Sequence, residues 1–333
     1  MKKSKVLVTG SAGFLGSSMC YELLKNGYEV IGLDSYQNSN ETNTKKLDEI
    51  FKDSYKFYEI NLANQLDLLI DIFKIEKPET VIHFAAEKSV NISKKQPIYY
   101  WENNLYSTIN IVKAMNCIEC SKFIYSSSAA VYGNSTNTPV KEDNFLNPIS
   151  PYAQTKLACE MFIKDISNNK DFKSIILRYF NPVCSHLDQV IHDDLEKDEC
   201  SLIQEIVKTA LGKNKTLKIF GSEYDTNDGT CERDYIHTQD LLDAHFKSME
   251  YLDKIKETLV INVGTGKPVS ILELVRIFEN ENKVEINYEF DKKRDGDITT
   301  SYADVSKINR ELGWKSKRDI SDIVIDAWKP FKI

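Results

Sequence analysis

The sequence lacks any apolar stretch long enough to cross a membrane. A membrane-spanning helix needs about 18 to 20 apolar residues in a row, and no segment of this chain approaches that length. The N-terminus, MKKSKVLVTG, carries lysines, but the apolar stretch after them is far too short for the hydrophobic region of a secretion signal. We therefore expect no membrane contact and a cytoplasmic protein.

The sequence also lacks an excess of basic residues and an extracellular cysteine pattern. The formal net charge is -7, whereas a nucleic-acid-binding domain carries a basic patch, so we expect no nucleic-acid partner. The seven cysteines are scattered and odd in number, which is typical of a reducing compartment. Cys117 and Cys120 form a lone CxxC without a second pair or nearby histidines, so we expect no metal site.

The sequence does contain a regular alternation of short apolar runs and longer helical patterns. Of its 333 residues, 41% are hydrophobic and 28% are charged, which allows a sizeable core. Strands are predicted at Lys5–Thr9, Glu29–Leu33, Lys56–Ile60, Thr80–Phe84, Lys122–Ser126 and Ser174–Tyr179, and helices at Phe14–Asn26, Gln65–Lys74, Pro97–Met115 and Tyr152–Asn168. This alternation predicts an α/β fold, a Rossmann-type doubly wound parallel sheet with helices on both faces.

The pattern changes after Tyr179. Residues 181–234 are polar, rich in loops and weakly periodic, whereas Leu259–Val263 resembles one more strand and Ile271–Glu279 one more helix. We therefore predict two domains. The nucleotide-binding domain spans 1–180, with 235–265 returning to it, and a smaller, partly interleaved substrate domain spans 181–234 and 266–333.

A glycine-rich turn follows the first predicted strand. Gly10, Gly13 and Gly16 lie in this turn and at the start of the first helix, and Phe14 and Leu15 stand between the last two. Glycines here permit a tight turn, close approach of a diphosphate and close helix–strand packing, while the helix N-terminus offers free N–H groups. The alternative is an ordinary strand–helix turn. The position directly after the first strand favours a dinucleotide site.

Asp34 ends the second strand, 18 residues after Gly16. A carboxylate at this place can accept hydrogen bonds from the ribose hydroxyls of NAD and would repel the 2′-phosphate of NADP. Ser35 and Tyr36 follow, and neither offers a positive charge to that phosphate. The alternative is an aspartate that only caps a helix or a turn. We predict NAD as the cofactor.

Ser128, Tyr152 and Lys156 are the candidate catalytic residues. Tyr152 and Lys156 are four residues apart, so on a helix they share a face, and Pro151 suits the first turn of that helix. A free tyrosine has a pKa of about 10, but a nearby lysine ammonium and a cationic nicotinamide ring both favour the phenolate. Such a tyrosine can remove a hydroxyl proton while hydride leaves the same carbon. The alternative is a surface helix carrying both residues by chance.

Together these features resemble the extended short-chain dehydrogenase/reductase superfamily, and most closely the UDP-glucose (UDP-galactose) 4-epimerases. The resemblance covers nearly the whole chain. The matching stretches are Val6–Gly16, Val81–Phe84, Tyr125–Gly133, Leu177–Pro182, Phe220–His237 (FGSEYDTNDGTCERDYIH), Asn262–Gly266 and Arg294–Asp297. The family pattern implies that Ser128 and Tyr152 handle the proton, and that Lys156 also binds the nicotinamide ribose.

The resemblance also implies further contacts. Near the cofactor it places Asn61, Lys88 and Asn104, with Asn61 where many relatives have an acidic residue. Around a UDP-sugar substrate it places Asn181, Ser201, Leu202, Phe220, Arg233, Arg294, Asp297 and Ser301. Arg233 and Arg294 suit bidentate phosphate recognition. The alternative for each arginine is a surface ion pair.

The resemblance weakens between Val183 and Gln204. Cys200 and Ser201 stand where relatives carry an asparagine pair that helps to hold the nucleotide, which leaves the base specificity open. His186 and His192 lie in this loop, and we interpret them as polar loop residues rather than metal ligands.

The family pattern implies that one retained NAD oxidises C4 of a UDP-hexose and then reduces the 4-keto sugar on its other face. A 4,6-dehydratase would need an acid–base pair where this chain has Ala129 and Ala130.

The family pattern also bears on the sugar. A serine at 301 implies acceptance of N-acetylated sugars as well as glucose and galactose, although a shift of the alignment by one residue would place Tyr302 at this position. Two alternatives stay open: a related NAD-dependent enzyme for another base or sugar, and a catalytically weak binding protein. Family members often pair helices corresponding to Pro97–Met115 and Tyr152–Asn168, which implies a homodimer.

Overall fold

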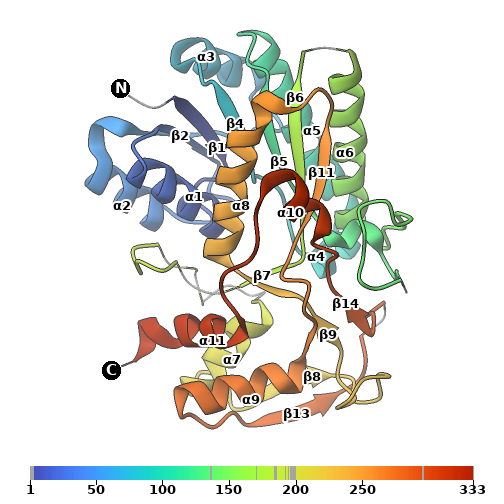
Figure 1. The fold of residues 1–333 in the computed structure, drawn as a ribbon. Coiled ribbons are helices and arrows are strands. Elements are labelled where there is room, and N and C mark those ends of the chain that lie inside the picture. Colours follow the sequence, from blue (N-terminus) through green and yellow to red (C-terminus); the bar gives the residue numbers. More distant parts are fainter. Residues whose placement is uncertain are drawn as a thin grey trace.

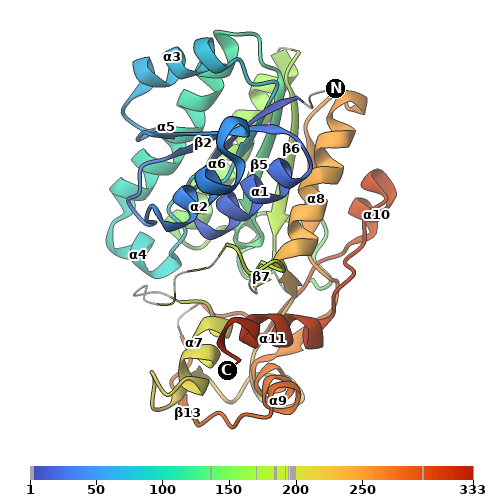
Figure 2. The ribbon, with the colours of Figure 1, turned by 90° about the vertical axis from the view of Figure 1, so that its left-hand side faces the viewer.

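The computed structural model describes residues 4–135, 137–169, 171–183, 186–191, 193, 195, 200–294 and 296–332. Within these ranges, no helix is both long and apolar enough to span a membrane. Figures 1 and 2 show a large sheet flanked by helices, with a smaller group of helices and strands below it.

Seven parallel strands form the central sheet in the order β11–β6–β5–β4–β1–β2–β3. Its strands are β1 (Lys5–Thr9), β2 (Glu29–Asp34), β3 (Tyr55–Glu59), β4 (Thr80–His83), β5 (Lys122–Ser128), β6 (Lys173–Tyr179) and β11 (Leu259–Val263). Successive side chains serve opposite faces, so Val6 and Val8 join one buried cluster while Leu7 joins the other. This two-sided burial explains why the strand sequences are continuous apolar runs.

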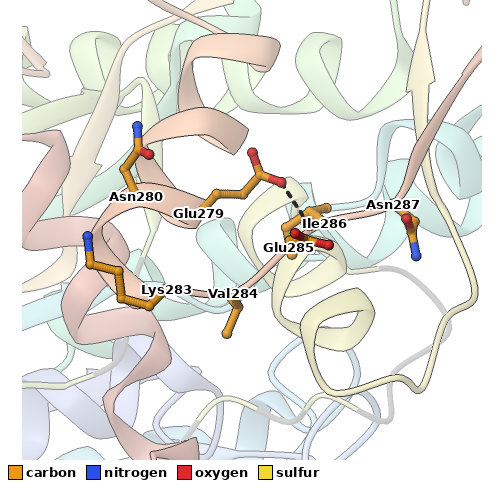
Figure 3. A pocket seen from close by; sticks show the side chains of 7 residues that line it. All are labelled: Glu279, Asn280, Lys283, Val284, Glu285, Ile286 and Asn287. Atoms are coloured by element: carbon orange, nitrogen blue, oxygen red, sulfur yellow. Dashed lines mark hydrogen bonds between the residues drawn. The ribbon is translucent and has the colours of Figure 1, made fainter.

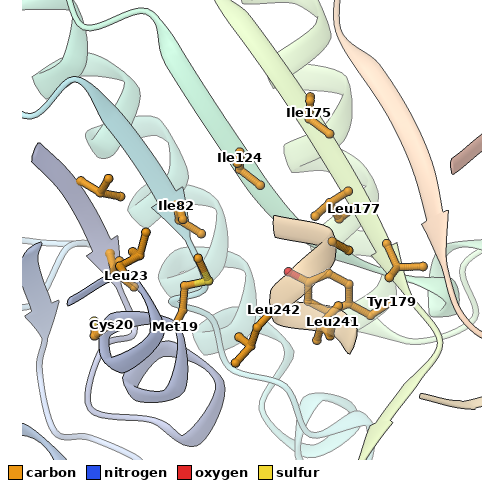
Figure 4. Packing of buried hydrophobic residues seen from close by; sticks show 14 of the residues in the cluster. Met19, Cys20, Leu23, Ile82, Ile124, Ile175, Leu177, Tyr179, Leu241 and Leu242 are labelled. Carbon is orange, nitrogen blue, oxygen red and sulfur yellow. The ribbon is translucent and has the colours of Figure 1, made fainter. Parts of the chain in front are cut away.

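Helices pack on both faces of the sheet (Figure 1). One face carries α1 (Phe14–Lys25), α2 (Thr42–Phe51) and α8 (Thr238–Tyr251), and the other carries α3 (Leu66–Glu76), α5 (Pro97–Asn116) and α6 (Pro151–Asn169). In Figure 4, Met19 of α1 and Leu242 of α8 pack toward Ile82, Ile124 and Leu177 of the sheet. The predicted Rossmann-type fold is confirmed.

The remaining strands are short. They are β7 (Asn181–Val183) paired with β10 (Tyr235–His237), β12 (Val269–Ser270) paired with β9 (Glu232–Arg233), which also pairs with β14 (Thr300–Ser301), and β8 (Leu217–Phe220) paired with β13 (Tyr288–Asp291). The helices α7 (Leu202–Ala210), α9 (Ile271–Asn282) and α11 (Ile320–Trp328) share a separate hydrophobic cluster. The helix α10 (Ser306–Leu312) instead packs against β11, and α4 (Val90–Lys95) precedes α5.

The sequence-based prediction missed several helices. Residues 181–234 were expected to be rich in loops, yet α7 begins there with a capping box between Ser201 and Gln204 and buries Ile203, Ile206 and Val207. The start of α8 lacks a recognisable hydrophobic pattern because its first residues, Thr238, Gln239 and Asp240, are polar although they are buried. Polar residues with internal partners break the hydrophobic period on which prediction depends.

A buried ion pair joins α6 to β6. Arg178 is 1% exposed and Glu160 is fully buried. Arg178 Nε donates to Glu160 Oε1 at 2.9 Å and Nη2 donates to Oε2 at 2.6 Å, a bidentate pair. The Ser127 hydroxyl donates to the same carboxylate at 2.5 Å, and Arg178 Nη1 donates to the Tyr132 hydroxyl at 2.9 Å. The pair therefore fixes the end of β5 against α6 and β6.

We predict that Glu160→Ala strongly destabilises the fold. It leaves the guanidinium of Arg178 buried without its carboxylate, which typically costs about 3–5 kcal/mol. Urea denaturation monitored by circular dichroism measures the free energy of unfolding. Glu49→Ala, an exposed site on α2, is the matched control and should change it by no more than about 0.5 kcal/mol. Equal effects of the two substitutions would contradict a structural role for the ion pair.

Candidate active site

The turn between β1 and α1 has the geometry of a diphosphate-binding loop. Gly10 has a positive φ of 67°, and a Cβ on Gly16 would lie 2.0 Å from the Gly10 carbonyl oxygen. Both positions therefore require glycine. The N-cap residue of α1, Gly13, supplies no capping side chain, so the first-turn N–H groups at Phe14 and Leu15 remain suited to an external anion.

Asp34 organises the loop that follows β2. Its Oδ2 accepts a hydrogen bond from Ala12 N at 3.0 Å, and its Oδ1 accepts from Tyr36 N at 2.9 Å and from Ser39 Oγ at 3.1 Å. A carboxylate has about four acceptor sites, so capacity remains for a ribose hydroxyl. Asp34 therefore caps the turn after β2, which is the alternative role considered for it from the sequence. Its contact with the ribose of NAD stays a prediction.

Two further predicted cofactor residues support the surrounding loops. Asn61 lies two residues after the end of β3, and its Oδ1 accepts from Ala63 N at 3.0 Å. Asn104 of α5 is 1% exposed, accepts from Glu87 N at 2.8 Å, and donates to Glu87 O at 3.1 Å and to Thr155 Oγ1 at 3.0 Å. Asn104 therefore joins α6 to the loop that carries the exposed Lys88.

Ser128, Tyr152 and Lys156 converge where β5 ends and α6 begins. Ser128 is the last residue of β5, and its Oγ accepts from Ala130 N at 3.1 Å. Tyr152 lies in the first turn of α6, is partly buried, and is hydrogen-bonded to Ser128. One turn further, Lys156 is 3% exposed and donates to Ser126 O at 2.7 Å. The sequence-predicted catalytic group is therefore one spatial cluster.

Burial shifts the pKa values of this cluster. Desolvation lowers the pKa of Lys156 to about 8, although Cys159 and Glu160 partly oppose the shift. Burial raises the pKa of Tyr152, and the hydrogen bond from Ser128 lowers it only in part. A hydroxyl that donates to the phenolate oxygen lowers the pKa of a tyrosine, which is the role that this shift favours for Ser128. The pKa of Tyr152 is lowered by Ser128, and the expected effect of Lys156 on the phenolate stays a prediction.

Most of the predicted substrate residues form a second cluster. The guanidinium of Arg294 stacks on Phe220, with Cζ 3.6 Å from the ring centroid. Arg233 Nη2 lies 4.0 Å from Asp297 Oδ1, and both side chains are partly exposed. Ser301 pairs with Arg233 in register between β14 and β9. The arginine–aspartate contact is too long for a tight ion pair, so both groups remain able to bind a ligand.

Asn181 and Ser201 are connected differently. Asn181, in β7, donates its N–H to Asp234 O at 3.0 Å, which links it to the strand of Arg233. Ser201 is the N-cap of α7: its N–H donates to Gln204 Oε1 at 2.8 Å, and its hydroxyl accepts from Gln204 N at 3.4 Å. Leu202 packs at the rim of the α7–α9–α11 cluster. The described bonds of Ser201 are those of a helix cap, and a substrate contact stays a prediction.

Residues 186–191 of the divergent loop pack against α2 and the C-terminal end of α1. His186 Nε2 lies 3.1 Å from Glu22 Oε1, and Lys25 Nζ lies 2.6 Å from Asp188 Oδ2. Glu22, His186 and Asp188 bring three possible metal-ligand atoms together. His186 already pairs with Glu22, and Asp188 with Lys25, so these contacts account for the grouping. His192, also interpreted as a polar loop residue, lies outside the described residues.

A separate surface hollow lies where α9 turns toward β13. Figure 3 shows its lining, which includes Glu279, Asn280 and Lys283. Glu279 Oε1 accepts from Ile286 N at 2.9 Å and stabilises the turn. None of the candidate site residues lines this hollow, so we assign no function to it.

Sequence reasoning missed the residues that support the site. Arg178 carried a usable signal, because one charged residue interrupts the apolar strand SIILRY and a charge buried on both sides needs a partner. Its partner Glu160 carried none, since a glutamate on a helix is normally exposed. Asp234 was visible only as one residue of the FGSEYDTNDGTCERDYIH stretch.

Comparison with known proteins identifies relatives that match nearly the whole chain. Residues 7–327 match the family model described as GDP-mannose 4,6 dehydratase. UDP-glucose 4-epimerase from Bacillus subtilis is 38% identical over 325 residues, covering 97% of this chain and 96% of that protein.

Solved structures agree. The crystal structure of UDP-glucose 4-epimerase from Stenotrophomonas maltophila, with bound NAD and formylated UDP-arabinopyranose, superposes with a TM-score of 0.94 at 35% identity, covering 98% of this chain and 97% of that one. The UDP-Glc/GlcNAc 4-epimerase from Campylobacter jejuni gives 0.85 at 34% identity, covering 98% of each. The chain therefore belongs to the UDP-glucose 4-epimerase family of the extended short-chain dehydrogenase/reductases.

Proposed function

We propose that the protein is an NAD-dependent epimerase that inverts C4 of UDP-hexoses through a 4-keto sugar. It interconverts UDP-glucose and UDP-galactose, and also UDP-GlcNAc and UDP-GalNAc. The observation that carries the proposal is the cluster of Ser128, Tyr152 and Lys156 at the carboxyl end of β5, on the same edge of the parallel sheet as the glycine-rich turn after β1. The similar Bacillus subtilis and Campylobacter jejuni proteins are named for 4-epimerisation, the second for both UDP-Glc and UDP-GlcNAc.

The residues after Ser128 separate this reaction from dehydration. A 4,6-dehydratase starts with the same oxidation at C4 but then eliminates water, which requires an acid and a base next to the sugar. Here Ala129 and Ala130 follow Ser128, and their methyl side chains cannot move protons. The local chemistry therefore favours epimerisation, although the matching family model is described as a dehydratase.

The residues at the carboxyl edge of the sheet fit NAD. The uncapped N-terminus of α1 suits the diphosphate, and Asp34 suits unphosphorylated ribose hydroxyls. When bound, NAD supplies a hydride acceptor that later serves as the donor. Asp34 repels a 2′-phosphate, so denatured protein should release NAD rather than NADP.

Tyr152 moves the proton. Its phenolate oxygen removes the proton from O4 as C4 is oxidised and returns it after the sugar ring has turned. Ser128 donates to this oxygen and stabilises the phenolate. Because burial raises the pKa of Tyr152 more than Ser128 lowers it, the phenol becomes an effective base only when a cation lies against it.

Arg233 and Arg294 anchor the nucleotide while the sugar turns. Two guanidinium groups can bind a diphosphate bidentately, and Phe220 holds the guanidinium of Arg294 flat against its ring. The anchor keeps the keto sugar next to the site that oxidised it, so the ring can present its other face without escaping.

A second candidate function is recognition of a nucleotide other than UDP, with or without turnover. One observation favours it: Ser201, beside Cys200, caps α7, at the place where the family pattern has an asparagine pair. The convergence of the catalytic cluster argues for turnover. A coupled assay with several nucleotide sugars decides the base, and turnover of UDP-sugars supports the first function.

We further propose a cytoplasmic homodimer built from the two domains expected from the sequence. Ile98, Tyr106 and Met161 expose large apolar side chains on α5 and α6, which pack against each other, and exposed apolar side chains on neighbouring helices suit a partner subunit. The described cysteines are free thiols, which fits a reducing compartment. For the domain division, β11 joins the central sheet, while α7, α9 and α11 share their own core.

We predict that Tyr152→Phe lowers kcat by about 10² to 10⁴. The substitution removes the oxygen that accepts the O4 proton and keeps the ring. A coupled assay with UDP-Glc and UDP-GlcNAc measures turnover, and bound NAD together with circular dichroism shows that the fold persists. Tyr58→Phe, which removes a phenol hydrogen-bonded to Glu76, is a control expected to keep kcat. Wild-type turnover in Tyr152→Phe would rule out Tyr152 as the base.

We predict that Ser301→Tyr removes activity on N-acetylated sugars. Ser301 lies in register with Arg233, and a tyrosine ring there takes the volume through which a 2-acetamido group must swing. Turnover of UDP-GlcNAc and UDP-GalNAc should fall at least about tenfold more than that of UDP-Glc and UDP-Gal. Ser301→Ala should keep all four activities. A wild type inactive on both N-acetyl sugars contradicts the assignment of Ser301.

A further inference from the structure

Asp234 is a fully buried carboxylate between two predicted substrate segments. It follows Arg233 directly, and its side chain is 0% exposed. A Cβ on Gly264 would lie 2.4 Å from Asp234 Oδ2, so the carboxylate packs directly against the backbone after β11. No ion pair of Asp234 occurs within the described ranges, and its stabilisation comes from hydrogen bonds.

Four donors from two segments surround this carboxylate. Its Oδ1 accepts from Thr265 N at 2.8 Å and from Thr265 Oγ1 at 2.6 Å. Its Oδ2 accepts from Gly266 N at 3.0 Å and from Ala303 N at 3.1 Å. Burial raises the pKa of Asp234 and these hydrogen bonds lower it in part. The side chain thus ties the turn after β11 to the residues that follow β14.

The backbone of Asp234 connects two more segments. Its N–H donates to Ser301 O at 3.1 Å, and its carbonyl accepts from Asn181 N at 3.0 Å. Asn181, Arg233 and Ser301 are all predicted substrate contacts. Each of them either precedes Asp234 or is hydrogen-bonded to it.

The strands that carry these residues are too short to fix their own register. β7 has three residues, and β9 and β14 have two each, whereas a strand usually has about five or six. A ladder of this length contributes few hydrogen bonds. The Asp234 carboxylate, with its bonds to Thr265, Gly266 and Ala303, supplies the missing constraint.

We propose that Asp234 is a positioning residue for the UDP-sugar site, holding the segments of Asn181, Arg233 and Ser301 in the register that binds the ligand. The inference rests on the proposed function and adds a residue that touches neither substrate nor catalytic group. Asp234 then determines the affinity for the UDP-sugar and not the rate of catalysis, because the catalytic cluster lies on other elements, β5 and α6.

The test is Asp234→Asn in the NAD-containing protein. Whichever way the amide is turned, its NH2 group meets backbone N–H donors, either that of Thr265 or those of Gly266 and Ala303. We expect the KM for the UDP-sugar and the Kd for UDP to rise at least about tenfold, while kcat stays within about threefold and the NAD content is unchanged. Calorimetry with UDP measures binding independently of turnover.

Two further variants separate positioning from stability. Asp240 is 1% exposed and accepts from Lys317 N, Arg318 N and Arg318 Nη1, so Asp240→Asn disturbs a comparable buried carboxylate away from the substrate cluster. It should lower the melting temperature without changing KM. Thr265→Val removes one bond to Asp234, should raise KM by a smaller factor, and keeps the test available where Asp234→Asn does not fold.

Unchanged UDP affinity in Asp234→Asn, or in Thr265→Val where only that variant folds, overturns the inference. An equal rise of KM in Asp240→Asn overturns it as well, because a general loss of stability then explains the effect. A wild type that binds UDP but does not interconvert UDP-sugars contradicts the proposed function alone, and the UDP affinities of the variants still decide the role of Asp234.

Discussion

The bidentate ion pair between Arg178 and Glu160 is the constraint on which the catalytic half of the molecule depends. It crosses from β6 to α6 in the core, and the hydroxyl of Ser127 donates to the same carboxylate. Ser127 precedes Ser128 in β5, and Glu160 lies one turn after Lys156 in α6. The pair therefore fixes the distance between the two elements that carry the candidate catalytic residues. A buried charge pair of this kind is sensitive to geometry, since either partner alone is strongly unfavourable.

The substrate half is held in a different way. Its strands form only two- and three-stranded sheets, and hydrogen bonds from a few polar side chains reinforce the short ladders. Asp234 joins the segments of Asn181, Arg233 and Ser301, and the Ser201–Gln204 capping box starts α7. The catalytic edge is thus rigid through the sheet, whereas the substrate cluster depends on individual polar contacts. This difference explains why substitutions in the two halves should separate kcat from KM.

The sequence was sufficient for the central sheet because strands buried on both faces are continuous apolar runs. β1 and β11 have the predicted bounds, and β5 extends to Ser128 instead of ending at Ser126. Short motifs also predicted the cluster of Ser128, Tyr152 and Lys156. Prediction failed where polar residues are buried: α8 begins with Thr238, Gln239 and Asp240, which read as a loop. The sequence could not distinguish a turn-capping role of Asp34 from a contact with ribose. It also gave no sign that Asn104 is hydrogen-bonded to two segments. Such roles depend on partners that the sequence pattern does not reveal.

The central claim is that hydride removed from C4 returns to C4 of the same sugar. Incubation with UDP-glucose deuterated at C4 tests it most directly, with nuclear magnetic resonance of the UDP-galactose formed. Since Tyr152 handles only the O4 proton and the diphosphate anchor retains the keto sugar, the account predicts full retention of deuterium at C4. Loss of the label to solvent would contradict the account, because C4 would then be inverted, or the sugar otherwise changed, by exchangeable protons.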